Sequence, residues 1–179
     1  VQIVGDSAFA GCTGLTGTLT LGNGLQTIGF NAFYDCPFSG DLVIPDSVTM
    51  IGIQAFYCRP YFLPETQGTL TLGKNLRTIG ESAFCESRYT GSLTIPDSVV
   101  EIGERAFYKC ENLNGTLTLG RSLRTIGKEA FYWCAFTGSL TIPEGVAEIA
   151  DGAFSSLYQF NRDGMFNGTL TLPSTLKTI

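Results

Sequence analysis

The dipeptide Ala-Phe recurs along this chain at nearly equal steps, and this recurrence restricts the possible folds more than any other feature. It lies at residues 8–9, 32–33, 55–56, 83–84, 106–107, 130–131 and 153–154. Successive copies are therefore 24, 23, 28, 23, 24 and 23 residues apart. A repeat this short cannot bury its apolar face alone, so the spacing predicts a solenoid in which each coil packs against its neighbours.

Two kinds of coil alternate along the chain. A-type coils read GTLTLGxxLxTIG and begin at residues 17, 68, 115 and 168, the last with Pro in place of the second Gly. B-type coils read G[SD]L[TV]IP[DE]xVxxI and begin at residues 40, 91 and 138. The sequence unit is thus a pair of coils of about 47 residues. Two insertions break the rhythm, near residues 57–67 and 155–167.

The A-type coil that begins at residue 115 shows how one coil should fold. Residues 116–119 alternate Thr and Leu, which is the period of a strand with one buried face. Leu117 and Leu119 should point inward while the Thr side chains point outward. Leu123 and Ile126 form the next inward pair. The pattern therefore predicts a parallel sheet built from one such strand per coil.

Residues 128–131 (KEAF) predict a short helical or 3₁₀ turn, with Ala at a tight contact and Phe in the centre of the coil. Because stacked strands lie ~4.8 Å apart, the repeated phenylalanines should form an internal ladder. About seven coils of 23–24 residues then make one domain over residues 1–179. Residues 1–4 and 176–179 share one phase of the repeat, so we expect a slice of a longer array, uncapped at both ends. The ladder comprises Phe9, Phe33, Phe56, Phe84, Phe107, Phe131 and Phe154.

The composition weighs against catalysis and against two classes of partner. The chain has no His, the commonest general base, and no GxSxG, HExxH or phosphate-binding motif. Its net charge of −5 does not suit a nucleic-acid partner. No apolar run approaches the ~20 residues that cross a bilayer. We therefore expect a protein that is not an enzyme, needs no cofactor, binds no nucleic acid and does not insert this segment into a membrane.

The line SLTIPDSVVEIGERAFYKC, at residues 92–110, resembles the BspA-like leucine-rich repeat, and the resemblance extends over the whole chain. It implies a right-handed solenoid with a parallel sheet. It also implies a surface or secreted protein of a host-associated microbe that takes part in adhesion to matrix or host proteins and in contact between cells. The chain lacks the Asn or Cys that follows LxxLxLxx in receptor leucine-rich repeats, so their ligands are not implied.

The six cysteines do not follow the pattern of a disulfide framework. Four of them lie three residues after a repeat Phe, and in the last coil that position holds Leu157. A position that accepts Leu is an apolar core position, so we expect free, buried thiols. Cys58 and Cys85 are displaced from it by one and two residues. Zinc binding is disfavoured because the spacing is wrong and His is absent.

Thr and Ser fill the outward strand positions. One interpretation is β-propensity with solvated hydroxyl groups; the other is a flat recognition face for a protein or glycan, which repeated weak contacts would suit. The candidate face comprises Thr18, Thr20, Thr69, Thr71, Ser92, Thr94, Thr116, Thr118, Ser139, Thr141, Thr169 and Thr171.

Two further rows of side chains could lie along the solenoid. Tyr34, Tyr57, Tyr108 and Tyr132 follow the Ala-Phe dipeptides, with Trp133 beside them, and predict an aromatic ridge. The ridge is either half-exposed packing of the turns or a second binding surface. Arg77 and Arg124 of A-type coils could alternate with Glu101 and Glu148 of B-type coils in a charged row, for which a solvated face is the alternative.

The two insertions are the least repetitive part of the chain. They contain Arg59, Tyr61 and Phe62 in the first, and Tyr158, Phe160 and Arg162 in the second. Loops on a rigid scaffold often carry function, although repeat arrays also tolerate insertions at low cost. The sequence therefore favours a non-catalytic extracellular binding or adhesion module. The alternative is a rigid spacer or stalk without a ligand of its own.

Overall fold

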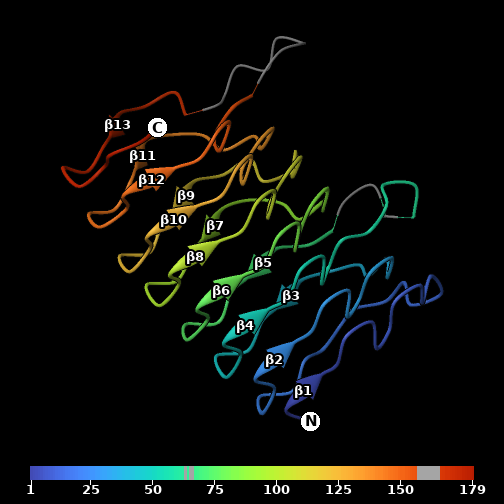
Figure 1. Ribbon diagram of the computed structural model, residues 1–179. Helices are drawn as coiled ribbons and strands as arrows, with labels where there is room; N and C mark the ends of the chain where they lie inside the picture. Colours follow the sequence, from blue (N-terminus) through green and yellow to red (C-terminus); the bar gives the residue numbers. More distant parts are fainter. Residues whose placement is uncertain (63, 65–66, 157–165) are drawn as a thin grey trace.

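The computed structural model describes residues 1–62, 64, 67–156 and 166–179. The chain winds into a parallel-sheet solenoid whose coils stack from the N-terminus to the C-terminus (Figure 1). It makes about six coils, one fewer than the count of Ala-Phe dipeptides predicts. Residues 1–16 and 168–179 each supply only part of a coil. The predicted leucine-rich-repeat solenoid is confirmed.

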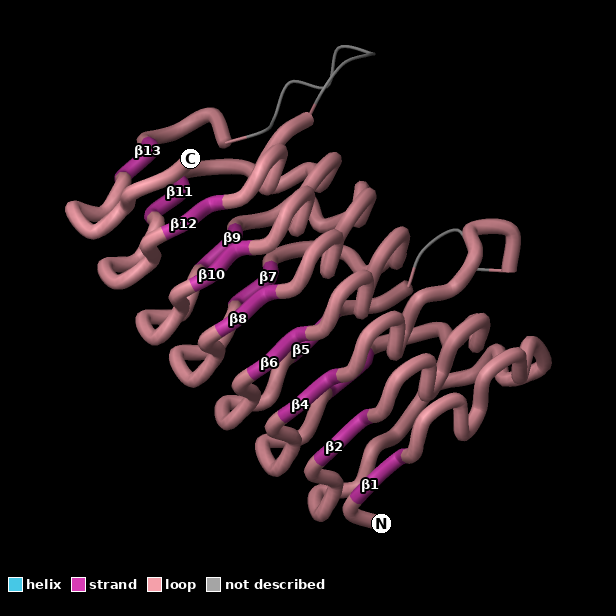
Figure 2. Tube along the Cα trace, viewed as in Figure 1, coloured by secondary structure: helices cyan, strands magenta, loops and turns pink. Residues whose placement is uncertain are grey.

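The largest sheet lies where the sequence predicted only a pair of inward residues. Its seven parallel strands follow one another one coil at a time (Figure 2). Thr125 of β10 pairs with Glu101 of β8, and Ile126 pairs with Ile102, so equivalent residues meet. The strands are β1 (Ile3–Val4), β2 (Thr27–Ile28), β4 (Met50–Ile51), β6 (Thr78–Ile79), β8 (Glu101–Ile102), β10 (Thr125–Ile126) and β12 (Glu148–Ile149).

The predicted Thr-Leu strands form the second side of the solenoid, but each is two residues long and they do not join into one sheet. Each pair instead joins a B-type coil to the A-type coil that follows it. Glycine at position 68 allows two such coils to approach closely. A Cβ on Gly68 would lie 2.5 Å from the backbone nitrogen of Asp41 in the preceding coil. The pairs are β3 (Leu42–Val43) with β5 (Leu70–Thr71), β7 (Leu93–Thr94) with β9 (Leu117–Thr118), and β11 (Leu140–Thr141) with β13 (Leu170–Thr171).

The third side consists of the Ala-Phe turns. The sequence predicted short helical or 3₁₀ turns here; the described residues form turns and contain no helix. Arg105 has a φ of 53°, a left-handed value that a continuing helix does not allow. Its N–H bonds to Lys128 O in the next coil at 2.8 Å, while the Tyr108 N–H bonds back to Arg105 O at 3.0 Å. Backbone hydrogen bonds thus join each turn to the turn of the neighbouring coil. Accordingly, the described segments offer no helix able to cross a bilayer.

A column of stacked phenylalanines fills the core, as predicted. Successive rings from Phe9 to Phe154 lie 5.2–5.4 Å apart between centroids and are nearly parallel. Phe84, Phe107 and Phe131 in the middle coils are fully buried. The inward Leu and Ile side chains of both sheet sides pack around this column.

A column of glycines sets how closely the coils approach beside each Ala-Phe turn. A Cβ on Gly103 would lie 2.6 Å from Glu81 N and 2.8 Å from Gly80 C in the preceding coil. Gly52, Gly80 and Gly127 meet the preceding backbone at similar distances. These glycines are therefore required because no side chain fits between the coils, and not only because they permit a turn.

Replacing Phe107, a ring in the middle of the phenylalanine column, should show how much this column contributes to the stability of the fold. We expect Phe107→Ala to lower the free energy of unfolding by about 3–5 kcal/mol, because it leaves a cavity between two rings that cannot close. Urea unfolding followed by circular dichroism measures this change. Val100→Ala, at a 40% exposed position, is the control and should cost about 0.5 kcal/mol or less. A similar small loss for both variants would contradict the account.

The glycine column gives a second prediction. Gly103→Ala should destabilise the protein by about 1–3 kcal/mol, because the added methyl group forces the coils apart. Gly22→Ala is the matched control, since a Cβ there meets nothing within 4 Å. Thermal unfolding of the two variants compares them, and equal midpoints would show that the coils can separate without cost.

Candidate binding surfaces

The Thr and Ser side chains of the candidate face are all exposed on the second side of the solenoid, as predicted. Several of them, however, hold neighbouring coils together. Asp41 accepts hydrogen bonds from Thr69 N at 2.7 Å and from Thr69 Oγ1 at 2.9 Å, which lower the pKa of the Asp41 carboxyl. Ser92 Oγ accepts in the same way from Thr116 N at 3.0 Å. The exposed Val43 also interrupts the row. The face is therefore not a continuous hydroxyl array, and its role in recognition stays a prediction.

The acidic residue after each B-type Pro was not singled out from the sequence, yet it joins adjacent coils. Asp97 accepts a hydrogen bond from Arg121 N at 3.0 Å and pairs with the Arg121 guanidinium at 2.5 Å. This pairing holds the pKa of Asp97 below its ordinary value. Asp46 and Lys74 repeat the arrangement. Because these side chains are exposed, each pair contributes little stability and mainly fixes register.

The predicted row of alternating Arg and Glu side chains is wrong. The Val100 N–H bonds to Arg77 O, which places Val100 beside Arg77. Glu101 instead lies beside Thr78 and Thr125. The two kinds of charge thus occupy neighbouring columns. No ion pair joins them in the part of the chain that the structure describes.

The aromatic ridge exists as two pairs of half-buried rings, of which Tyr108 and Tyr132 are stacked and Tyr34 and Tyr57 are tilted relative to each other. Tyr34 and Tyr57 lie 5.2 Å apart between centroids, and so do Tyr108 and Tyr132. Cys85 occupies the ring position in the coil between the two pairs. At one end, Trp133 packs edge-on against Tyr132 at 6.3 Å. It remains 37% exposed.

The first insertion begins with an ion pair whose acidic partner, Asp35, is buried. Asp35 is only 2% exposed in its side chain, and its carboxylate receives three contacts from Arg59. The Arg59 backbone N–H donates at 3.0 Å, Nε donates at 2.8 Å and Nη2 lies at 2.5 Å. A carboxylate this buried is stable only while it is paired and hydrogen-bonded. Asp35 therefore fixes the direction in which the loop leaves the solenoid.

Polar contacts also hold the far end of this loop. The buried Gln67 donates from Nε2 to Phe38 O at 3.1 Å and accepts at Oε1 from Arg88 N at 2.8 Å. The Arg88 guanidinium donates to Pro64 O at 2.9 Å and to Pro60 O at 3.3 Å. Both ends of the insertion are thus attached to the neighbouring coils.

Between these ends the loop presents an aromatic and cationic cluster. The Tyr61 and Phe62 rings lie 4.3 Å apart, and the Arg59 guanidinium lies 5.2 Å and 5.0 Å from their centroids. Tyr61 is 69% exposed. The structure therefore brings together the three residues predicted in the first insertion. The candidates in the second insertion, Tyr158, Phe160 and Arg162, lie outside the described residues.

All six cysteines are free thiols, and five of them are buried, as predicted. The position three residues after Phe is nevertheless not purely apolar. Cys36 Sγ donates to Phe9 O at 3.0 Å, and Cys110 Sγ donates to Phe84 O at 3.1 Å, each across one coil boundary. The same position holds the buried Ser87 in another coil. That serine was a signal in the sequence that this position makes a hydrogen bond.

Comparison with known proteins identifies the repeat. Residues 1–63 and 62–179 match the model of the BspA type leucine-rich repeat region, in 6 copies. No curated protein matches the chain significantly.

Three solved structures are similar over almost the whole chain. A leucine-rich cell surface protein from Faecalibacterium prausnitzii is 25% identical over 98% of this chain and 52% of its own, with a TM-score of 0.47. The Pneumococcal vaccine antigen PcpA is 19% identical over 99% and 53%, with a TM-score of 0.41. A leucine-rich repeat protein from Bacteroides ovatus is 20% identical over 99% and 66%, with a TM-score of 0.34. The chain thus spans about half to two thirds of these proteins.

The buried thiols give a prediction that separates core positions from reactive sites. Burial raises the pKa of Cys36 to about 11 and those of Cys58 and Cys85 to about 12, so little thiolate forms near neutral pH. We expect only Cys12 to react quickly with Ellman's reagent in the folded protein at pH 8. All six thiols should react in 8 M urea, which serves as the control. Fast labelling of Cys58 or Cys85 in the folded protein would show that these coils are open to solvent.

Proposed function

Because this chain belongs to the family of BspA type leucine-rich repeat regions, we propose that it is a non-catalytic binding or adhesion module. Its partner is a host or matrix protein that it meets at a cell surface or in secreted form. The family resemblance supports the extracellular location, and the absence of His from the sequence supports a role without catalysis.

The observation that carries this proposal is the attachment of the first insertion. A loop that is merely tolerated needs no buried partners. Here Asp35 and Gln67 are both buried and both use their polar groups to hold the loop. Replacing either would leave buried polar atoms unpaired. The coils therefore hold Tyr61 and its neighbours in one arrangement, which lowers the entropy cost of binding.

The composition of the loop also suits a protein interface. Tyr and Arg are enriched among the residues that contribute most to protein binding, while Lys and Glu are depleted at interface centres. Tyr61, Phe62 and Arg59 form one compact cluster at the surface. The cluster lies on the side of the solenoid that the Ala-Phe turns form, here called the turn side. A rigid solenoid that presents such a cluster can bind a partner protein through a small patch.

The alternative function is a rigid spacer. The regular columns of rings and glycines support it, since they give a stiff rod without requiring any ligand. A spacer would have no use for an exposed aromatic cluster that buried groups hold in place. The first insertion therefore favours binding.

A binding panel with a single side-chain change tests the proposal. The folded chain should bind at least one of a set of immobilised matrix and host-cell surface proteins. Tyr61→Ala should weaken that binding about tenfold or more, because it removes an exposed anchor and leaves the Asp35–Arg59 pair intact. Biolayer interferometry measures both affinities.

Met50→Ala, on the exposed side of the seven-stranded sheet, is the matched control and should bind like the unchanged chain. No binding by the folded chain would favour the spacer. If Tyr61→Ala binds as well as the unchanged chain, the binding site lies instead on the candidate face of Thr and Ser side chains or on the aromatic ridge.

A further inference from the structure

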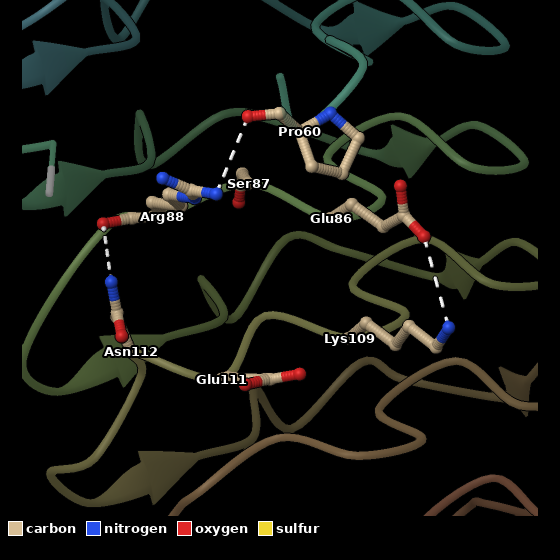
Figure 3. Close-up of a pocket in the computed structure, with 7 residues that line it drawn as sticks. All are labelled: Pro60, Glu86, Ser87, Arg88, Lys109, Glu111 and Asn112. Atoms are coloured by element: carbon tan, nitrogen blue, oxygen red, sulfur yellow. Dashed lines mark hydrogen bonds and ion pairs between the residues drawn. The ribbon is translucent and has the colours of Figure 1, made fainter. Parts of the chain in front are cut away.

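A polar pocket of about 370 Å³ lies next to the first insertion, on the turn side of the solenoid. It is formed by three consecutive coils, which contribute the residues Pro60, Glu86, Arg88, Lys109, Glu111 and Asn112 (Figure 3). It adjoins the coil in which Cys85 interrupts the aromatic ridge. The missing ring leaves this part of the turn side to polar side chains.

One wall of the pocket is fixed. The Arg88 guanidinium is held by the carbonyl oxygens of Pro60 and Pro64, at 3.3 Å and 2.9 Å. Arg88 N is bound to the buried Gln67. The contacts that attach the loop therefore also shape the pocket.

The remaining polar groups are weakly engaged. Glu86 Oε1 and Lys109 Nζ are 3.9 Å apart, which is long for an ion pair. Asn112 Nδ2 reaches Arg88 O only at 3.5 Å. Glu111, which also lines the pocket, makes no ion pair or side-chain hydrogen bond with the described residues. Figure 3 shows Glu86 and Lys109 on one side of the pocket and Arg88 and Asn112 on the other. The pocket thus offers both donors and acceptors.

We propose that this polar pocket binds a neutral sugar residue of an oligosaccharide. Its two carboxylates balance its two cationic side chains, so a charged ligand of either sign would meet groups of its own sign. A hydroxyl group both donates and accepts hydrogen bonds, so a polyol can satisfy both kinds of group. An apolar ligand would not fit, because such ligands require a mostly apolar lining.

An aromatic ring at the edge of the pocket supports this ligand class. The Lys109 ammonium lies 5.3 Å from the centroids of both Tyr108 and Trp133. Trp133 is therefore next to the pocket, and it is one of the exposed large side chains. The apolar C–H face of a sugar ring packs on such an indole while its hydroxyl groups face polar side chains. Trp133 would hold one sugar and the pocket the next.

This inference does not depend on the protein-binding role of Tyr61, and one set of variants tests the two separately. The folded chain is applied to an array of neutral, sialylated and sulfated oligosaccharides. We expect binding to neutral oligosaccharides, and titration calorimetry with the strongest one measures the affinity. The double variant Glu111→Gln with Asn112→Ala should weaken it about tenfold or more, because sugar hydroxyl groups lose their partners. Trp133→Ala should weaken it as well.

Glu101→Gln makes the same charge change in β8 of the seven-stranded sheet, outside the pocket, and should leave sugar binding unchanged. Tyr61→Ala should also leave it unchanged, even if it abolishes binding to a protein. The proposal is overturned if no neutral oligosaccharide binds the folded chain. Equal binding by the pocket variant, or a preference for charged oligosaccharides, would overturn it as well.

Discussion

Every coil of this protein must repeat at the spacing that its hydrogen bonds to the neighbouring coils impose, and the rest of the structure follows from that constraint. Equivalent residues meet in register from β1 to β12. Side chains that stack well at this distance, such as the core phenylalanines, form continuous columns. Where the backbones approach still more closely, as at Gly103, only glycine fits.

The same constraint explains which features could be predicted from the sequence. The phenylalanine column and the buried cysteines follow directly from the period, because an inward residue stacks on its own copy. The seven-stranded sheet was missed because a strand of two residues, such as Thr125–Ile126, is too short to show alternation. The form of the turns, predicted as helical or 3₁₀, could not be settled from the sequence because nothing in the residue type of Arg105 reveals its left-handed backbone.

The ion pairs show why the average length of the repeat does not by itself predict which charged side chains meet. Asp97 and Arg121 are 24 residues apart and pair, because the B-type coil between residues 91 and 114 has that length. Arg77 and Glu101 are also 24 residues apart, but the intervening A-type coil is one residue shorter and places Val100 beside Arg77. The Asp35–Arg59 pair depends on the path of the insertion itself. Such a path cannot be read from a repeat. The insertion residues were identified from the sequence, but not the buried groups that hold them.

These findings connect the scaffold to the proposed function. The stacked coils supply fixed, buried partners, and the first insertion uses them to hold an exposed aromatic cluster and one wall of the polar pocket. The most direct test of this connection is the affinity of the variant Asp35→Asn for a protein partner captured by the unchanged chain. It alters no exposed group, so we expect weaker binding by a domain that is still folded, because the loop loses its fixed direction. Unchanged affinity in a folded variant would contradict the claim that the coils hold the loop for binding.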